Sequence, residues 1–301
     1  MKDTKLKQIP FLIENLGKLS RHIPNFLNLR GKLMWILMPK IRGRNFKTII
    51  RYDLGQKISL DLDDWIPIQI FLTGFYFVEK KHTEYFKKLI KTGDVFFDIG
   101  AQIGYYTIIA STRVGKKGHV YSFEPFPPSF QVLRNNIQMN NFQNVSLYNL
   151  AVSDKKEYTW LYLQNRENSG SATFISSKQF FKQEKAGYIT KVECTTIDDF
   201  IREKNIQKVD LIKIDTEGAE PKVLSGMQNL LSSGCPKILI EINEKQLNSF
   251  GYFKEYIYEY LSDRGYKAYD ISGNKIKLIS KYVEGNLVLF LKGNKYEREK
   301  F

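Results

Sequence analysis

Acidic side chains stand at or just after several short apolar runs of this 301-residue chain, and such runs are typical of buried strands. The acids are Asp98, Glu124, Asp215, Glu217 and Glu241. A carboxylate in such a place can bind a positive charge, accept hydrogen bonds from hydroxyl groups, or remove a proton from a reacting group. The residues around each acid indicate which of these roles it suits.

A glycine-containing turn follows the first acid. Its small residues allow the backbone to turn sharply into a helix and to approach a ligand closely. An acid two residues before the first glycine would repel a diphosphate, but it suits a ligand that carries ammonium and sulfonium charges. S-adenosylmethionine is such a ligand. The cofactor-binding candidates in this turn are Asp98, Gly100, Ala101, Gln102, Gly104 and Tyr105.

Two further segments complete the expected cofactor site. In Glu124-Pro125-Phe126, the acid is placed to accept hydrogen bonds from two ribose hydroxyls, and the phenylalanine ring can flank an adenine. Glu124 by itself does not separate a nicotinamide enzyme from a methyltransferase. After the next strand, the side chains expected along the adenine edge are Asn149, Ala151 and Ser153.

The acids after the later strands are the catalytic candidates. Methyl transfer to a hydroxyl is an in-line displacement, so the protein mostly aligns the acceptor oxygen and helps to remove its proton. We expect Asp215 to be the general base or the group that orients the acceptor, followed by Glu217 and then Glu241. Lys213 either biases the charge at this place or simply lies at the edge of the strand.

The same three acids raise the question of a metal. Carboxylate oxygens are hard ligands that suit a divalent ion such as Mg²⁺, but nothing in the spacing demands one. The two cysteines, Cys194 and Cys235, have no paired spacing, so a zinc site or a disulfide framework is not expected. We therefore predict a site without a metal, in a protein of a reducing, cytoplasmic compartment.

The elements that must position these residues alternate between strand and helix. This alternation predicts a doubly wound, Rossmann-like α/β fold with a mostly parallel sheet, in which ligands bind at the carboxyl ends of the strands. Expected strands are 95–99, 119–123, 145–152, 209–214, 237–242, 266–271 and 286–291, and expected helices are 104–112, 128–140, 197–203, 220–231 and 252–264. Residues 154–192 read as a polar insertion.

The residues before this domain differ from it in pattern. Residues 49–64 alternate around Gly55 as in a hairpin, and residues 65–90 have helical spacing with aromatic residues that we expect to be core. We therefore divide the chain into a basic helical N-terminal extension (1–50), a cap or lid (51–92) and a class I methyltransferase domain (93–295).

The formal net charge of +14 is concentrated at the start of the chain. Residues 1–50 hold eleven Lys and Arg against Asp3 and Glu14, and their apolar runs are too short to span a membrane. Three interpretations stay open: peripheral contact with an anionic membrane at its inner face, attraction of an acidic substrate, and a solvated extension.

Four segments together resemble the FkbM family of methyltransferases. They are Val95-Phe-Phe-Asp-Ile-Gly-Ala-Gln-Ile-Gly-Tyr-Tyr-Thr107, Phe123-Glu-Pro-Phe126, Asn149-Leu-Ala-Val-Ser-Asp154 and Ile212-Lys-Ile-Asp-Thr-Glu-Gly-Ala-Glu220. The resemblance covers roughly residues 93–245 and departs from the family at Gln102, where asparagine is usual. It implies a class I fold with an antiparallel last strand, S-adenosylmethionine as cofactor, and O-methylation of a hydroxyl on a sugar, glycan or secondary metabolite.

Three other functions are alternatives to methylation of a hydroxyl group. A nicotinamide dehydrogenase favours Gly-x-Gly-x-x-Gly without a preceding acid, which this chain lacks. A nucleic-acid methyltransferase is suggested by the basic charge, but the turn after the fourth strand holds Asp215-Thr-Glu-Gly, which is crowded with negative charge. The third rival is a non-catalytic partner protein that binds S-adenosylmethionine.

Overall fold

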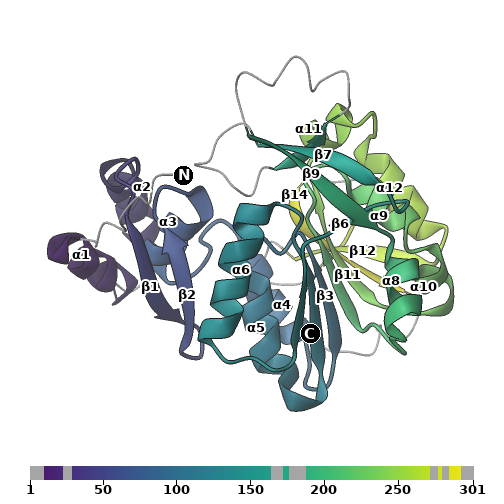
Figure 1. The fold of residues 1–301 in the computed structure, drawn as a ribbon, viewed down its shortest axis with the longest axis horizontal. Coiled ribbons are helices and arrows are strands. Elements are labelled where there is room, and N and C mark those ends of the chain that lie inside the picture. Colours follow the sequence, from purple (N-terminus) through teal and green to yellow (C-terminus); the bar gives the residue numbers. More distant parts are fainter. Residues whose placement is uncertain are drawn as a thin grey trace.

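The structure is a computed structural model, and it describes residues 10–22, 29–163, 172–175, 188–271, 277–279 and 285–292. Its centre is an eight-stranded sheet with the order β13-β12-β14-β11-β10-β3-β4-β5 (Figure 1). The strands are β3 (Val95–Ile99), β4 (His119–Phe123), β5 (Val145–Tyr148), β10 (Leu211–Ile214), β11 (Lys237–Ile242), β12 (Tyr266–Asp270), β13 (Lys277–Leu278) and β14 (Gly285–Lys292).

The pairing of these strands confirms the predicted fold class. Strands β5, β4, β3, β10 and β11 are parallel neighbours, while β14 runs antiparallel between β11 and β12. The parallel strands are apolar along nearly their whole length because helices cover both faces of the sheet.

Neighbouring side chains of one strand show the two covered faces. Phe96 packs into one hydrophobic cluster and Phe97 into another, as expected for residues that alternate across a strand. The first face is covered by α4 (Lys80–Leu89), α5 (Tyr105–Val114) and α6 (Pro127–Met139). The second is covered by α8 (Ile197–Lys204), α9 (Glu220–Ser225), α10 (Gln228–Ser233), α11 (Glu244–Ser249) and α12 (Lys254–Ser262) (Figure 1). A short 3-10 turn, η2 (Gly115–Lys117), leads into β4.

An N-terminal lobe, which we define as residues 10–22 and 29–73, lies beside the first face. It holds α1 (Phe11–His22), α2 (Leu29–Ile41), the hairpin β1 (Lys47–Tyr52) and β2 (Gln56–Asp61), and α3 (Trp65–Thr73). The hairpin prediction is confirmed by the antiparallel pairing of β1 with β2. Buried Met34 and Ile58 belong to the same cluster as Phe96, so this lobe shares a core with the sheet. The divisions at residues 50 and 92 stay predictions.

The predicted strand 145–152 is wrong as one element, because it is split between two sheets. β5 ends at Tyr148, and the Asn149 side chain then donates to the backbone oxygens of Glu124 and Pro125 at 2.8 and 3.0 Å. These bonds turn the chain away, and β6 (Ala151–Val152) pairs with β9 (Tyr188–Thr195) instead.

The polar insertion contains strands that its composition did not reveal. Among its described residues, β7 (Tyr158–Leu163) and β8 (Thr173–Ile175) join β9 and β6 in a small sheet of order β6-β9-β7-β8. This sheet lies over the carboxyl ends of the central strands (Figure 1).

The predicted helix 220–231 is also wrong as one element. It breaks into α9 and α10 around Gly226, where an added Cβ would lie 2.1 Å from the backbone oxygen of Ser153. The new helix start is capped from outside: the Asp198 carboxylate accepts from the backbone N–H groups of Asn229 and Leu230 at 2.8 and 3.0 Å. No helix among the described residues has the length and apolar character needed to cross a membrane.

Candidate active site

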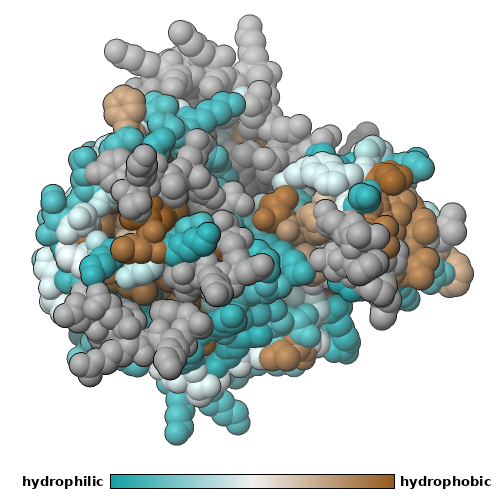
Figure 2. All heavy atoms as spheres, turned by 180° about the vertical axis from the view of Figure 1, so that it is seen from behind, coloured by the Kyte–Doolittle hydropathy of each residue, from teal (hydrophilic) through white to brown (hydrophobic). Residues whose placement is uncertain are grey.

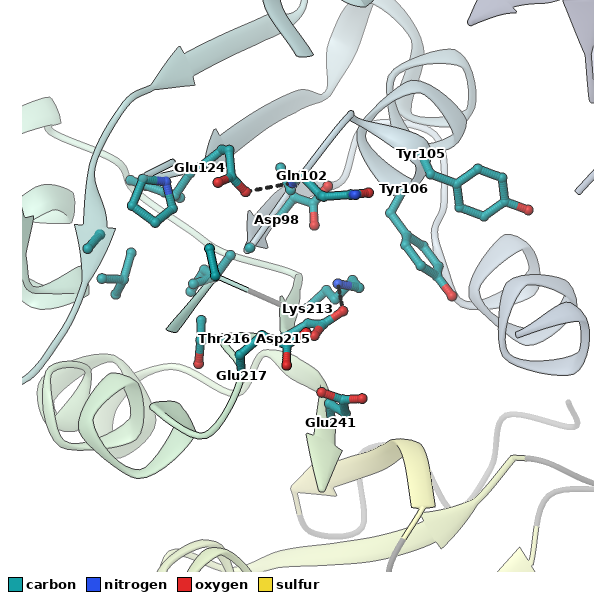
Figure 3. A pocket seen from close by; sticks show the side chains of 18 of the residues that line it. Asp98, Gln102, Tyr105, Tyr106, Glu124, Lys213, Asp215, Thr216, Glu217 and Glu241 are labelled. Carbon is teal, nitrogen blue, oxygen red and sulfur yellow. Dashed lines mark hydrogen bonds and ion pairs between the residues drawn. The ribbon is translucent and has the colours of Figure 1, made fainter. Parts of the chain in front are cut away.

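One pocket lies where the carboxyl ends of β3, β4, β10 and β11 meet the small sheet of the insertion (Figure 3). Residues from every predicted segment line it together. The predicted residues in its lining are Asp98, Gly100, Ala101, Gln102, Tyr105, Glu124, Pro125, Ala151, Lys213, Asp215, Glu217 and Glu241. The parallel sheet produces this meeting because each of these strands ends at the same edge.

Four predicted residues lie outside the lining and hold it in place instead. Gly104 begins α5, where an added Cβ would lie 2.6 Å from a Leu133 methyl carbon. Phe126 packs among β6, β7 and β9 and gives its backbone N–H to Glu124. Asn149 bonds the backbone of the Glu124 loop, and Ser153 donates its backbone N–H to the oxygen of Thr195 at 2.9 Å.

The glycine turn approaches the loop after β10 so closely that a side chain has no room. Gly100 has φ +82°, and an added Cβ would lie 1.8 Å from the backbone oxygen of Asp215. The turn continues through Gln102 at φ 50°, in the left-handed region. The predicted need for small residues here is therefore explained by contact between two loops as well as by access for a ligand.

Glu124 is fixed by two backbone donors. Its Oε2 accepts from the Gln102 N–H and its Oε1 from the Phe126 N–H, each at 2.8 Å. Burial raises the pKa of this carboxyl to about 7 in spite of these bonds. Each carboxylate oxygen has a second lone pair, so both can still accept from the hydroxyls of a ligand.

Asp98 offers the clearest sign of a missing partner. Its Oδ2 accepts from the Thr107 hydroxyl at 2.6 Å, while its Oδ1 is buried and has no hydrogen-bond partner among the described residues. Burial raises the pKa of this carboxyl. Leaving such an oxygen unpaired is costly, and a cationic or hydrogen-bond-donating ligand in the pocket would satisfy it.

An ion pair lies next to Asp98 in the pocket, because Lys213 of β10 is the register partner of Asp98 on β3. The Lys213 ammonium lies 2.8 Å from Asp215 Oδ2 and 5.1 Å from the centre of the Tyr106 ring. Burial lowers the pKa of Lys213, but Asp215, Asp98 and Glu79 more than offset this, so its pKa is raised overall. Lys213 therefore stays charged and provides a fixed positive charge beside Asp215.

Two more acids face this ion pair (Figure 3). Glu217 has φ 56° and is bonded to the Gln246 side-chain amide. Burial, followed by repulsion from Asp215, raises the pKa of Glu217 to about 8 and that of Glu241 well above its usual range. Glu217 is therefore mostly protonated at neutral pH, and Glu241 Oε2 has no hydrogen-bond partner among the described residues.

The three acids also lie close enough to share a cation. Asp215, Glu217 and Glu241 each offer one oxygen, and these oxygens lie within 4.8 Å of one another. The set suits a hard divalent ion by its chemistry. Lys213, however, already places a positive charge on Asp215.

Glu220 has a supporting role in the same loop. Its Oε1 accepts from the Thr216 N–H, the Thr216 hydroxyl and the Gly218 N–H at 2.8, 3.0 and 3.2 Å. These bonds hold the loop that carries Asp215 and Glu217.

Sequence reasoning missed several lining residues from outside the motifs. Glu79 reaches the pocket from the segment before α4, and Leu161 and Phe174 reach it from the insertion. Glu79 accepts from the Tyr106 hydroxyl at 2.6 Å, and burial raises the pKa of Glu79 to about 7. No sequence signal marks Glu79, because it follows no strand.

The tyrosines of the pocket partly correct the expectation that the aromatic residues are core. Like Trp65 and Phe75, these tyrosines have a spacing that favours core positions, with the substrate pocket as the alternative, and Tyr105 was also a cofactor-binding candidate. Tyr76, Tyr105 and Tyr106 do pack against the hydrophobic cluster. They also line the pocket, whereas Trp65 and Phe75 of the same prediction do not. The position of Tyr105 and Tyr106 directly after the glycine turn is the signal that favours the pocket.

A parallel sheet with acids at its carboxyl edge, a glycine turn and a Glu set for ribose defines an α/β domain that binds a nucleoside cofactor. Residues 98–268 match the model of the methyltransferase FkbM domain. The chain belongs to the FkbM family of methyltransferases.

Three individual relatives of the chain are also methyltransferases. The chain is 30% identical over 156 residues to a hexuronic acid methyltransferase (AglP) of Haloferax volcanii, covering 50% of this chain and 56% of that protein. It is 27% identical to the 2-O-methyltransferase NoeI of Sinorhizobium fredii, covering 51% and 65%. It is 23% identical to the 31-O-demethyl-FK506 methyltransferase of Streptomyces tacrolimicus, covering 52% and 67%. The chain thus spans between about half and two thirds of these relatives.

The chain also aligns with a solved structure of a methyltransferase. The FkbM methyltransferase of Methylobacillus flagellatus aligns with a TM-score of 0.43 and 15% identity, covering 74% of this chain and 54% of that one. The cofactor of methyltransferases of this family is S-adenosylmethionine. The donor set fits it, since buried Asp98 has an unpaired oxygen for a cation and Glu124 is fixed for a pair of hydroxyls.

Proposed function

We propose that this chain methylates a hydroxyl group of a sugar, glycan or secondary metabolite. The observation that carries the proposal is the acidic end of the pocket, where Asp215, Glu217 and Glu241 face one another beside the cofactor segment. A hydroxyl-rich acceptor is the kind of ligand that such a set of carboxyl groups can hold by hydrogen bonds. The names of three relatives, which refer to a hexuronic acid, a 2-O position and a 31-O position, support the same class of acceptor.

The cofactor end of the pocket has a separate task. S-adenosylmethionine supplies an activated methyl group when it is bound. Asp98 would hold the positively charged end of this molecule, and Glu124 would accept from its ribose hydroxyls. The sequence predicts the same roles for Asp98 and Glu124, and these roles remain proposals.

Asp215 is the proposed base. It stands directly after β10 and is oriented by the Lys213 ammonium at 2.8 Å. As the acceptor oxygen forms its new bond to the methyl carbon and the bond from that carbon to sulfur breaks, Asp215 takes the proton of the hydroxyl. Positioned proton transfer of this kind is worth about 10²–10⁴-fold in rate.

Glu217 and Glu241 are proposed to bind the acceptor. The raised pKa of each favours its protonated form, and a protonated carboxyl can both donate and accept a hydrogen bond. Neighbouring hydroxyls of a sugar need such partners. Tyr76 and Glu79 would complete the acceptor side, because both line the same end of the pocket.

The nucleic-acid alternative is less well supported. Its main attraction is the basic charge, yet much of that charge lies in residues 1–50, and the pocket holds six acids against Lys213. Lys213 is the single basic side chain in the lining of the pocket, so the pocket offers little to bind a phosphate backbone.

The test is transfer of a labelled methyl group from S-adenosylmethionine to a panel of acceptors by the purified chain. The panel contains monosaccharides including hexuronic acids, oligosaccharides, polyketides and total RNA, each with and without EDTA. We expect label on a hydroxyl-bearing small acceptor and no effect of EDTA, because Lys213 already supplies the positive charge beside Asp215. Label on RNA alone would overturn the proposed acceptor class, and cofactor binding without transfer to any acceptor would favour the non-catalytic alternative.

A further inference from the structure

The outer faces of α1 and α2 carry large apolar side chains that are exposed. The exposed fractions are 81% for Phe11, 62% for Leu19, 53% for Trp35 and 58% for Ile36. Figure 2, which views the molecule from behind, shows brown atoms gathered on this N-terminal lobe at the right. The pocket described above does not use these residues.

The spacing of these residues places them opposite the packed faces of their helices. In α2 the buried side is formed by Met34, Leu37, Met38 and Ile41, while Leu29, Lys32, Ile36 and Lys40 recur at helical spacing on the exposed side. In α1, Gly17 lies against α3, since an added Cβ would sit 2.3 Å from the Phe71 ring. Both helices therefore rest on α3 and turn an apolar face outward.

The charge around these faces is mostly positive, and the acid of α1, Glu14, is paired with Lys18 at 2.7 Å. Between residues 15 and 52 the sequence holds nine Lys and Arg and no Asp or Glu. Lys18, Lys32 and Lys40 are exposed on α1 and α2 among the apolar residues. A surface that combines apolar side chains with lysines on a helix is suited to the interface of a membrane that contains anionic lipid.

We propose that the outer face of α1 and α2 binds the surface of an anionic lipid bilayer. Its apolar residues would enter the boundary between headgroups and acyl chains, and its lysines would contact the anionic headgroups. A second copy of this chain is a poorer occupant, because two like-charged faces repel each other.

The bound bilayer would lie near the active site. The Trp35 ring lies 5.5 Å from that of Trp65 at the start of α3, and Ile66, the next residue of α3, lines the pocket. One helix thus connects the proposed membrane face with the acceptor side.

The experiment is co-sedimentation of the full chain with vesicles of phosphatidylcholine alone or with a third of phosphatidylglycerol. We expect binding to the anionic vesicles only, weakened by 0.5 M salt because screening is then strong. The double variants Leu19→Ser/Ile36→Ser and Lys32→Glu/Lys40→Glu should each reduce binding at least tenfold. Phe253→Ser and Lys116→Glu/Lys117→Glu are matched controls, because they change residues that are equally exposed elsewhere.

Two further measurements keep the test decisive. Thermal unfolding should give the same midpoint for the variants and the wild type, since all changed side chains are largely exposed. Tryptophan emission should shift to shorter wavelength with anionic vesicles, and Trp35→Phe should remove that shift. The proposal is overturned by equal binding of both vesicle types, by equal losses in the control variants, or by a dimer in solution that the Leu19/Ile36 variant dissociates.

Discussion

At the scale of single residues, the site is defined by acids whose burial opposes their ionisation. Lys213 gives Asp215 a charged partner, whereas Glu217 and Glu241 face other carboxyl groups and have raised pKa values. These carboxyl groups thus differ in their surroundings, because Asp215 has the buried lysine within hydrogen-bonding distance.

The first prediction concerns Asp215. In Asp215→Asn the amide keeps the shape of the side chain but cannot take a proton, so kcat should fall by about 10²–10⁴-fold. The affinity for S-adenosylmethionine, measured by calorimetry, should change little. Asp263→Asn, at an exposed position after α12, is the control and should keep full turnover. Unchanged kcat in Asp215→Asn would assign the proton transfer to another group.

The second prediction concerns the cofactor. Glu124→Gln removes a charged acceptor that is set for two hydroxyls, and hydrogen bonds to charged groups are worth about 1.5–3 kcal/mol. The affinity for S-adenosylmethionine should therefore fall by roughly 10–100-fold. Calorimetric titration measures this directly, with Glu255→Gln on α12 as the control. An unaltered dissociation constant would show that Glu124 does not contact the cofactor.

The third prediction concerns pH. Burial raises the pKa of Glu124 in the folded chain to about 7, above the ordinary value of about 4.3 in the unfolded chain. The contribution of this group to stability is therefore fully present below pH 4.3 and is lost as the pH rises through 7. The unliganded wild type should lose thermal stability between pH 5 and 8, and Glu124→Gln should lose less. Parallel curves for the two proteins would contradict the raised pKa.

At the scale of elements, the site depends on contact between the turn after β3 and the loop after β10. Gly100 meets the backbone of Asp215 at a distance that no Cβ can occupy. Gly93 offers a matched comparison, because it also has positive φ (+87°) but no atom within 4 Å of an added Cβ.

The fourth prediction follows from this comparison. Gly93→Ala should cost only the strain of a left-handed residue, about 1–2 kcal/mol in the free energy of unfolding. Gly100→Ala should cost clearly more and should also abolish cofactor binding, because the two loops must separate. Urea unfolding and calorimetry measure the two effects. Equal losses in both variants would mean that the loops yield without cost.

At the scale of the whole molecule, the N-terminal lobe is joined to the α/β domain by side chains of α6. Asn136 Oδ1 accepts from the Ser59 N–H at 2.7 Å, and its Nδ2 donates to the Ile103 oxygen at 2.8 Å. Asn140 makes a similar pair of bonds to the backbone of Lys57 at 2.7 Å each. The hairpin edge and the start of α5 are thereby fixed to one helix.

The fifth prediction tests this joint. Asn136→Ala leaves two partly or fully buried backbone groups without partners, so the free energy of unfolding should fall by at least about 2 kcal/mol. Asn135→Ala, one residue earlier on the exposed side of α6, should change it by less than about 0.5 kcal/mol. Similar values for both variants in urea unfolding would show that the lobe is held by its apolar contacts alone.

The sequence by itself determined the fold class and the acids at the strand ends. Its resemblance to the FkbM family implied the antiparallel last strand. These follow from apolar runs and from residues that are adjacent in the chain, so local patterns suffice. The split of 145–152, the strands of the insertion and the break at Gly226 depend on partners far along the chain, such as Cys194 and Ser153. Only the tertiary structure brought Glu79 to the pocket and placed Glu217 and Glu241 against Asp215, because these contacts join residues that are far apart in the chain or lie in loops.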